Sequence, residues 1–327
     1  MGPGVDLWGR GCTCTRAAGR LAGRRVARGV GTRPGVRYRM ILLAILCGAA
    51  QAYVVPLAAT RPAASLAGIS LPRASDGTLV NLSEAVKASG DAKRTLLVLG
   101  TYPADFNMIE YGQRLRHYMP ELKAKGVERF LVVVNGPPSA ATKLSTLLGL
   151  PEEVELLSDP TGEAGRKFGV SRGWKPDDNG LNPYLKLYLM LFGIGPPNTL
   201  PAVITGYLGN PSGRRAWIET ALQQGQAAGR WPDNVLDMSE PGKPKNQFDE
   251  LPLVGGWGRR PLELATLRLQ NLKMSFDNWS EMKPTDDRCL TQLGGCVVVG
   301  EKGEALYSWV DNGICDVANF DEMVESL

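Results

Sequence analysis

The sequence Thr95-Leu-Leu-Val-Leu-Gly100 is followed almost at once by Tyr102-Pro-Ala-Asp-Phe-Asn-Met-Ile-Glu110. The first stretch is a continuous apolar run, which is typical of a central strand buried on both faces. The second stretch leads into a helical pattern over 107–125, and Asp105 or Asn107 is expected to cap the start of that helix. A buried strand that runs directly into a helix is a basic unit of α/β folds.

The residues on both sides of this unit extend the same pattern. Upstream, 69–71 and 78–82 predict a short hairpin. Downstream, the predicted strands are 129–134, 154–157, 295–299 and 305–310. The predicted helices are 139–148, which Ser139 would cap and Gly149 would stop, 161–168 and 319–327. This order predicts an α/β, thioredoxin-like fold, in which helices flank a central mixed sheet.

Residues 171–285 interrupt the pattern, and we expect a mainly helical insertion before the last β-hairpin. Tyr184–Ile194 is a strongly apolar helix that is too short to span a bilayer. It is either a core or interface helix or a contact with a membrane surface. A long helix is predicted from Pro261 to about 282, after a loop at 231–252.

The basic charge of the chain is concentrated at its N-terminus. Residues 1–39 contain nine arginines and a single acid, Asp6. The remaining residues carry 28 basic and 32 acidic side chains, a net charge of about −4. The body is therefore mildly acidic, and we expect no nucleic-acid partner.

The first part of the chain has the composition of a targeting segment. Residues 40–50 form a short apolar run after the arginines and lead into Ala50-Gln51-Ala52, a signal-peptide cleavage pattern. We expect a signal peptide region at 1–52, a transit-peptide-like segment at 53–68 and the folded domain at 69–327. The arrangement resembles the bipartite presequence of algae with complex plastids and implies a plastid location. Secretion is the alternative, and Met40 is an alternative start.

The segment Pro103–Glu110 resembles the active-site segment of the peroxiredoxins. In that family a Pro, a Thr or Ser and, three residues later, the peroxidatic Cys lie at the first turn of a helix. Backbone N–H groups and an Arg there stabilise the thiolate. Pro103 matches, but Asn107 stands at the Thr position and Glu110 at the Cys position, and Gln292–Gly295 lacks the expected Arg. The resemblance therefore implies no catalytic residue at the standard site.

Further motifs are similar to a cyanobacterial and plastid branch of the AhpC/TSA, peroxiredoxin-like proteins. They spread over nearly the whole chain after the targeting segment, the insertion included, and the string Arg260–Asn271 is the most specific of them. The other motifs are Asp105-Phe106 with Glu110-Tyr111, Asn182–Lys186, Gly206–Pro211 and Leu290–Gly295. This resemblance implies a thioredoxin fold and a link to antioxidant and redox function.

Three cysteines lie outside the N-terminal segment. Cys296 falls in a predicted apolar strand, where we expect a buried and inert thiol. Cys289, beside Arg288 in a predicted loop, has the better setting for a lowered pKa, although neighbouring acids oppose it. Cys315 is also predicted in a loop, and a Cys289–Cys315 disulfide would need Cα atoms within about 7 Å. Cys289 and Cys315 are the redox candidates.

Three functions remain open. The first is a plastid accessory or binding protein of redox homeostasis, without peroxidase activity at the standard site and with an unassigned protein partner. The second is a thiol-dependent antioxidant oxidoreductase that uses Cys289 or Cys315. The third is a peripheral thylakoid-membrane protein that binds through Tyr184–Ile194.

Neither a cofactor nor a metal site is predicted. The single histidine, His117, has no Cys or His partner at ligand spacing. Arg259, Arg260 and Arg268 could bind an anion or a membrane surface, but the neighbouring Glu263 favours ordinary ion pairing. The sequence assigns no oligomeric state.

Overall fold

The computed structural model describes residues 62–87, 94–209, 215–231, 236–237, 239, 245–251 and 260–327. The chain divides into two units, Met1–Tyr53 and Val54–Leu327, and every described residue belongs to the second. The expected signal peptide region at 1–52 and the first part of the expected segment 53–68 lie outside the described residues.

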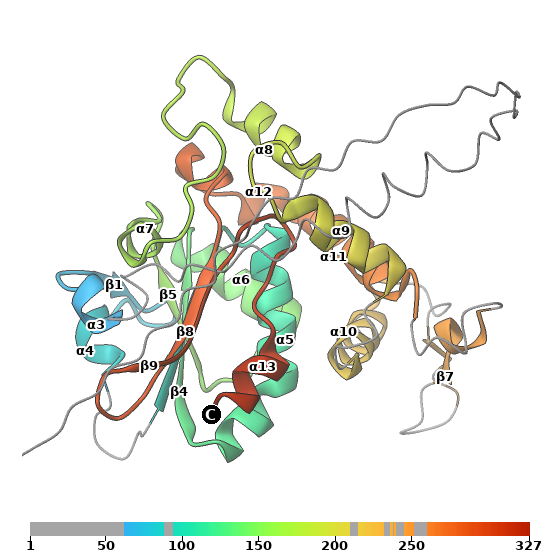
Figure 1. Ribbon diagram of the computed structural model, residues 1–327, viewed down its shortest axis with the longest axis horizontal. Helices are drawn as coiled ribbons and strands as arrows, with labels where there is room; N and C mark the ends of the chain where they lie inside the picture. Colours follow the sequence, from blue (N-terminus) through green and yellow to red (C-terminus); the bar gives the residue numbers. More distant parts are fainter. Residues whose placement is uncertain are drawn as a thin grey trace, which may run out of the picture. The chain divides into compact units, whose positions relative to one another are not determined.

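The centre of the fold is a five-stranded mixed sheet with the order β5-β4-β3-β8-β9 (Figure 1). Its strands are β3 (Arg94–Leu99), β4 (Val127–Val134), β5 (Val154–Ser158), β8 (Gly295–Val299) and β9 (Ala305–Val310). The first three are parallel, and β8 runs antiparallel to both β3 and β9. This topology is that of a thioredoxin-like fold and confirms the predicted fold class.

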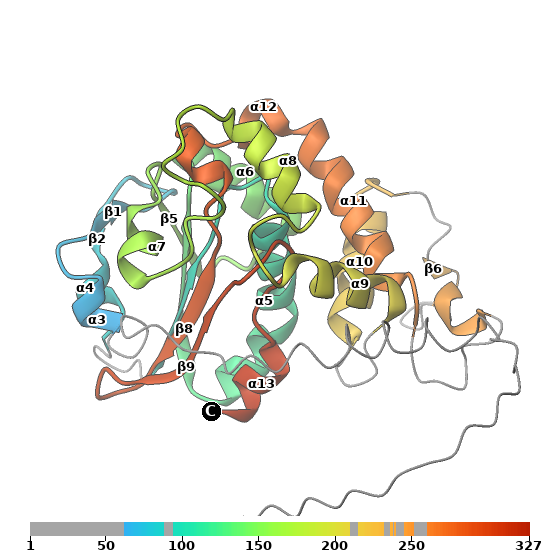
Figure 2. The same ribbon diagram turned by 45° about the horizontal axis from the view of Figure 1, so that its top comes forward.

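Helices cover both faces of the sheet (Figures 1 and 2). One face carries α5 (Phe106–Ala124), α6 (Pro138–Leu148) and α13 (Phe320–Glu325), and the other carries α3 (Pro62–Ser65), α4 (Leu82–Ala85) and α7 (Glu163–Phe168). Alternate residues of a strand point to opposite faces. Leu96 and Val98 therefore pack on the α5 side, and Leu97 and Leu99 pack on the α7 side. The apolar run at 95–99 is buried on both faces, as predicted.

The N-terminal part of the described fold begins before residue 69. Residues 62–68 were expected to be part of a transit-peptide-like segment, but they form α3 and the turn after it. Leu66 in this turn is fully buried in the core on the α7 side. The predicted hairpin follows, as β1 (Ser70–Pro72) pairs antiparallel with β2 (Leu79–Asn81).

Most of the chain between α7 and β8 is helical. The elements there are α8 (Pro183–Leu191), α9 (Thr199–Leu208), α10 (Ala216–Ala227), β6 (Leu236–Asp237), β7 (Lys245–Asn246), the 3-10 helix η1 (Gln247–Glu250), α11 (Glu263–Asp277), α12 (Trp279–Met282) and the 3-10 helix η3 (Asp287–Leu290). The helix predicted over 261–282 is two helices, because the chain turns at Asn278. Helices α9 and α10 were not predicted. The sequence of α9 contains Pro, Gly and β-branched residues, which lower helix propensity, and its packing along α11 supports it.

Helices α5 and α6 differ in how their first residues are capped. Helix α5 begins as predicted, because the Asp105 side chain accepts a hydrogen bond from the backbone N–H of Asn107 at 3.2 Å. The predicted Ser139 cap of α6 is wrong. Pro137 is the N-cap and the helix starts at Pro138, where a proline needs no hydrogen-bond donor. Gly149 ends α6 in the left-handed conformation, as predicted.

Candidate functional site

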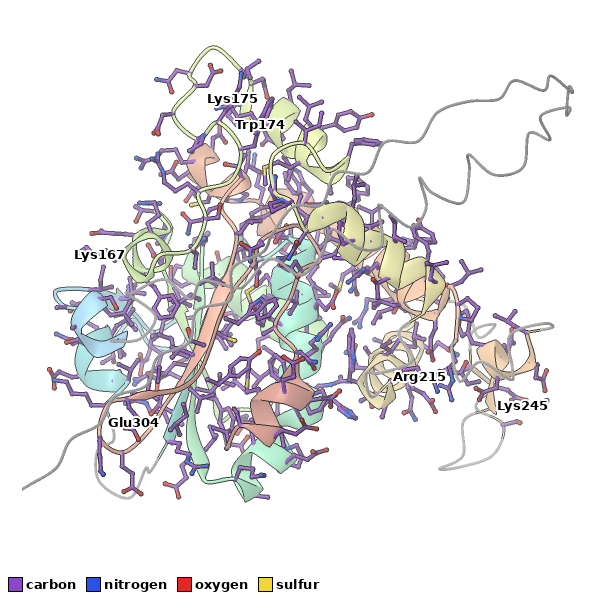
Figure 3. The ribbon with its side chains drawn as sticks, viewed as in Figure 1. Lys167, Trp174, Lys175, Arg215, Lys245 and Glu304 are labelled. Carbon is purple, nitrogen blue, oxygen red and sulfur yellow. The ribbon has the colours of Figure 1, made fainter. Side chains whose placement is uncertain are left out.

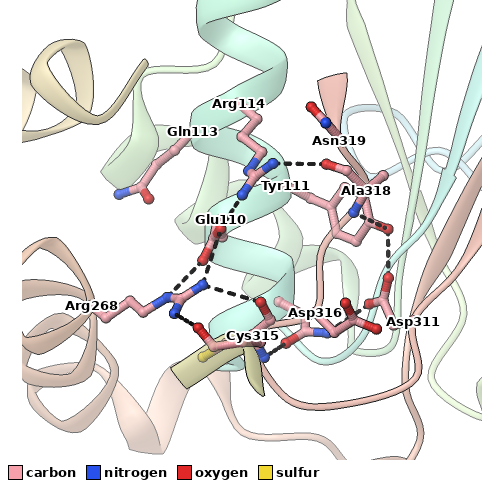
Figure 4. Close-up of polar contacts among 12 residues, drawn as sticks. Glu110, Tyr111, Gln113, Arg114, Arg268, Asp311, Cys315, Asp316, Ala318 and Asn319 are labelled. Atoms are coloured by element: carbon pink, nitrogen blue, oxygen red, sulfur yellow. Dashed lines mark hydrogen bonds and ion pairs between the residues drawn. The ribbon is translucent and has the colours of Figure 1, made fainter. Parts of the chain in front are cut away.

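A cluster of buried polar residues surrounds the first turns of α5 (Figure 4). Helix α5 contributes one wall, α11 from the insertion contributes a second, and the loop at 311–319 after β9 contributes a third. These three segments are far apart in the sequence, so only the folded chain brings their side chains together.

Glu110 is the centre of this cluster and is 1% exposed. Its Oε1 lies 2.6 Å from Nη2 of Arg114, one turn later in α5, and its Oε2 lies 3.1 Å from Nε of Arg268 in α11. Burial by itself would raise the pKa of this carboxyl, but the charges of Arg268 and Arg114 hold the pKa below its usual value. Glu110 is therefore an ionised carboxylate held between two guanidinium groups.

Arg268 connects four segments of the chain. Besides its pair with Glu110, it donates from Nη1 to the carbonyl of Ala202 at 2.9 Å and from Nη2 to the carbonyl of Cys315 at 3.1 Å. Arg268 is ion-paired, as expected, but its partner is Glu110, 158 positions away, and not the neighbouring Glu263. Two residues so far apart share no local sequence pattern from which their ion pair could be predicted.

The other two arginines of the predicted group lie elsewhere. Arg260 pairs with Glu263 at 3.0 Å, as expected, and also with Glu219 and Asp249. Arg259 lies outside the described residues.

Asn107 joins the start of α5 to the loop after β9. Its Nδ2 donates to Oδ2 of Asp311 at 2.6 Å and to the carbonyl of Gly313 at 3.1 Å, while its Oδ1 accepts from the backbone N–H of Cys315 at 2.7 Å. Asn107 is fully buried. Both ends of its amide are therefore used in holding the loop.

Asp311 is a functional candidate that the sequence did not reveal. It accepts hydrogen bonds from Asn107, from the Tyr111 hydroxyl at 2.7 Å and from Nε1 of Trp309 at 3.1 Å. Burial raises the pKa of Asp311 to about 8, against the opposing effect of the bonds from Tyr111 and Asn107. Its position directly after the last strand was the only local signal, and its α5 partners lie 200 or more positions upstream.

A third buried carboxyl, that of Asp105, lies at the helix start. Thr101 donates from Oγ1 to Oδ2 of Asp105 at 2.6 Å. Burial raises the pKa of Asp105 to about 6, although the hydrogen bonds of its capping role oppose this shift. The cluster thus contains the ionised carboxylate of Glu110 and three carboxyls, those of Asp105, Asp311 and Asp316, whose pKa burial raises.

Of the two redox candidates, the structure brings only Cys315 to this cluster. Its backbone bonds to Asn107 and Arg268, and its φ of 67° lies in the left-handed region, which is strained for a residue other than glycine. Burial raises the pKa of the Cys315 thiol to about 12, and the nearby charge of Arg268 only partly opposes this. Cys315 is therefore a protonated thiol at neutral pH.

Cys289 lies in η3, where its Sγ faces the carbonyl of Pro160 at 3.7 Å. The expected lowering of its pKa is wrong, because burial raises the pKa of Cys289 to about 12. The guanidinium of Arg288, which was expected to stabilise the thiolate, instead pairs with Asp286. Cys296 is buried in β8, as predicted, and all three residues are free thiols, so the structure contains no Cys289–Cys315 disulfide.

Two cavities meet at Cys315 and Arg268, which line both. One has a volume of about 170 Å³ and is mostly apolar, with Phe106, Leu191, Val203, Tyr207, Leu269 and Leu272 in its wall. The other has a volume of about 250 Å³ and is polar, with Arg114, Arg215, Arg260, Glu263, Asp316 and Asp321 in its wall. The polar cavity has acids beside its arginines, so its charges are largely balanced.

Metal ligands do not gather in the part of the chain that the structure describes. No group of three or more His, Cys, Asp and Glu side chains there could hold a metal ion. His117 lies on α5 with Nδ1 3.0 Å from the hydroxyl of Thr220, in a half-buried position.

The fold and this cluster define a thioredoxin-like protein whose candidate site lies at the start of the helix after the central strand. The family model described as AhpC/TSA antioxidant enzyme matches residues 114–313, which is more than half of the chain. The chain therefore belongs to the AhpC/TSA family of peroxiredoxin-like proteins. The match begins at Arg114, just after Glu110. No curated protein matches the chain.

Proposed function

We propose that this protein is an accessory or binding member of the AhpC/TSA family in plastid redox homeostasis, without peroxidase activity at the standard site. In this proposal Glu110 occupies the position of the peroxidatic Cys, and Asn107 occupies that of the Thr. The observation that carries the proposal is the buried Glu110 carboxylate between Arg114 and Arg268.

The chemistry of a carboxylate supports this role. A peroxidatic thiolate attacks one oxygen of the peroxide, becomes a sulfenic acid and is later reduced back. A carboxylate has no such reversible oxidation. It does carry the same single negative charge, so it satisfies the guanidinium groups that would otherwise stabilise a thiolate. A glutamate in place of the peroxidatic cysteine therefore keeps the negative charge of the site but removes its redox step.

The plastid location rests on the composition of residues 1–68. A fusion of these residues to a fluorescent reporter, expressed in an alga with a complex plastid, is expected to reach the plastid. Fluorescence in the culture medium instead would support secretion, which is the alternative.

A second candidate function is a thiol-dependent antioxidant oxidoreductase that uses Cys315. It is favoured by the position of Cys315, which is bonded to Asn107 and Arg268 and lines both cavities. It is opposed by the burial that raises the pKa of this thiol to about 12, since the thiolate is the nucleophile. Cys289 has the same raised pKa and lies outside the cluster.

Peroxide consumption by the full chain, in the presence of a dithiol reductant, separates the two candidates. We expect the wild-type rate to equal the background rate of the reductant, and the Cys315→Ser and Cys289→Ser variants to leave it unchanged. Wild-type turnover that is lost in Cys315→Ser would establish the second candidate and overturn the first. Wild-type turnover that is lost only in Cys289→Ser would overturn both candidate functions, because it would place the activity outside the cluster around α5.

A gain-of-function variant tests the position of Glu110 directly. Glu110→Cys places a thiol between Arg114 and Arg268, and we expect it to consume peroxide above the background rate. Glu84→Cys, at a side chain that is 66% exposed and outside the cluster, is the matched control. Equal rates for the two variants, with both proteins folded by circular dichroism, would contradict the assignment of Glu110 to the peroxidatic position.

A further inference from the structure

Helices α8, α9 and α11 expose an unusual amount of apolar side chain. Thirteen large hydrophobic side chains are exposed in the described part of the chain, and all but Leu79 lie between Tyr184 and Phe276. We call these twelve residues the apolar surface: Tyr184, Leu185, Tyr188, Phe192, Ile194, Leu200, Ile204, Tyr207, Leu208, Leu262, Leu269 and Phe276.

The apolar surface follows the spacing of helix faces. Tyr184, Tyr188 and Phe192 are four residues apart along α8, and Leu200, Ile204 and Leu208 are four residues apart along α9. Helix α9 packs along α11, and Figures 1 and 2 show both helices, with α8, on the side of the molecule away from α3 and α4. The stripe that a surface helix normally presents to water is polar, and here it is apolar.

The size of the apolar surface indicates that something covers it. Twelve side chains that are roughly half exposed present on the order of 1,000 Å² of apolar area in total, and a contiguous patch on a typical monomer reaches only about 300–600 Å². A surface of this size left in water would favour aggregation.

The α8 and α9 part of this surface lacks charge, whereas α11 adds an exposed ion pair, Lys273 with Asp277. Between Pro183 and Gly209 the only charged residue is Lys186, which is 5% exposed and donates from Nζ to the carbonyl of Asp178. The loop before α8 carries charges, but they pair within the loop, as Lys175 lies 3.7 Å from Asp178. Figure 3 shows Lys175 beside Trp174 in this loop.

We propose that the apolar surface docks onto the interface of a lipid bilayer made of electrically neutral lipids. The charge of the docking face selects this partner: α8 and α9 expose no charged side chain, and the exposed Lys273–Asp277 pair on α11 is neutral overall, so anionic headgroups offer this face no net attraction. This docking concerns a face of the insertion and goes beyond the function proposed for Glu110.

The three tyrosines of the surface favour lipid over a second copy of the chain. At a membrane interface a tyrosine ring enters the apolar region while its hydroxyl stays among headgroups and water. Between two copies the hydroxyls of Tyr184, Tyr188 and Tyr207 would be buried against mostly apolar side chains, which offer few hydrogen-bond partners. None of the described helices is long and apolar enough to cross a bilayer, so the proposed contact involves a single leaflet.

Docking would also cover the mouth of the apolar cavity. Tyr207 and Leu269 belong both to the apolar surface and to the wall of this cavity, whose other wall contains Cys315 and Arg268. An acyl chain at the docked surface would therefore lie next to the entrance of a cavity that leads to the candidate site.

Sedimentation of the full chain with phosphatidylcholine vesicles tests the proposal. We expect wild-type protein in the pellet, with a bound fraction that does not fall when the salt concentration is raised, because the contact of this surface with neutral lipid is apolar. The variant with both Tyr188→Asp and Phe192→Asp is expected to lower the bound fraction about tenfold. Leu79→Asp, at the exposed apolar side chain outside the surface, is the matched control and is expected to bind like the wild type.

Hydrogen exchange adds a readout that does not depend on a variant. Vesicles are expected to slow exchange in peptides from α8 and α9 but not in peptides from β1 and β2.

Wild-type protein that stays in the supernatant, or a double variant that binds as well as Leu79→Asp, would overturn the proposal. If the wild type forms dimers without vesicles and the double variant does not, the surface binds a second copy of the chain. This result would also overturn the proposal.

Discussion

The guanidinium Nε of Arg268 lies 3.1 Å from Oε2 of Glu110, although the two residues are 158 positions apart in the chain. Glu110 lies on the helix that follows the central strand, and Arg268 lies on a helix of the insertion. The insertion is therefore part of the candidate site. Without α11, the buried carboxylate would lose one of its two guanidinium partners.

Neutralising Glu110 is expected to destabilise the fold. Glu110→Gln keeps the shape of the side chain but removes the buried charge that pairs with the partly buried guanidinium groups of Arg114 and Arg268. Removing one partner of a buried ion pair typically costs about 3–5 kcal/mol, and we expect a loss of about 3 kcal/mol in the free energy of unfolding. Urea denaturation followed by circular dichroism measures this loss. Glu84→Gln, at an exposed pair with Lys87, is the control and is expected to change stability by less than about 1 kcal/mol.

The pair of Glu110 with Arg268 is expected to show strong energetic coupling. In a double-mutant cycle, Arg268→Met leaves Glu110 with Arg114 alone, and Glu110→Gln leaves Arg268 buried without its carboxylate. The double variant is expected to lose about 2 kcal/mol less than the sum of the single variants, because it leaves fewer buried charges unpaired. Additive losses in urea denaturation would mean that the two side chains do not interact in solution.

Asp311 is expected to make stability depend on pH. Its pKa is about 8 in the folded protein and near the ordinary value of 3.8 when unfolded, so between these values the folded state holds the extra proton. Its contribution to stability is fully present below pH 3.8 and is lost as the pH rises through 8. The slope is at most about 1.4 kcal/mol per pH unit for one proton.

Asp311→Asn isolates this contribution, because the amide cannot take up the proton. Urea denaturation at several pH values between 5 and 9 is expected to give a flatter profile for the variant than for the wild type. Asp105, with its pKa raised to about 6, acts in the same direction and is present in both proteins. Parallel profiles would show that Asp311 does not hold a proton in the folded state.

The three late thiols are expected to react slowly in the native protein. Cys289, Cys296 and Cys315 are buried, and burial raises the pKa of each above its usual value. Alkylation at pH 7.5, mapped by mass spectrometry, is expected to be at least about tenfold slower than in urea, because only the thiolate reacts. A Leu79→Cys variant supplies an exposed thiol as control. Alkylation of Cys315 at the rate of that control would support the second candidate function.

Much of the central sheet could be predicted from the sequence. The runs at 95–100 and 129–134 are continuous and apolar, and they became β3 and β4, because a strand covered by helices on both faces needs apolar side chains on both sides. The start of α5 was also predicted, since the Asp105 cap is a local contact. Helix α9 was not predicted, because its stability comes from packing along α11 and not from its own residues.

The environment of the thiols was predicted less well. Arg288 stands next to Cys289 in the sequence, which suggested a lowered pKa, but in the fold Arg288 pairs with Asp286 and Cys289 is buried. Whether a side chain meets water or the core depends on segments that arrive from elsewhere in the chain. For Cys289 that segment includes Pro160, 129 positions upstream.

The sequence by itself determined the order of strands and helices and the presence of a carboxylate, Glu110, at the first turns of α5, because these depend on residues a few positions apart. Only the tertiary structure decided that this carboxylate is buried between Arg114 and Arg268 and that Cys315 lies against Asn107. Ion pairs and burial act through space. Arg114 is one helical turn from Glu110, but Arg268 and the Cys315–Asn107 contact each join positions more than 150 residues apart, where no periodicity or spacing relates them.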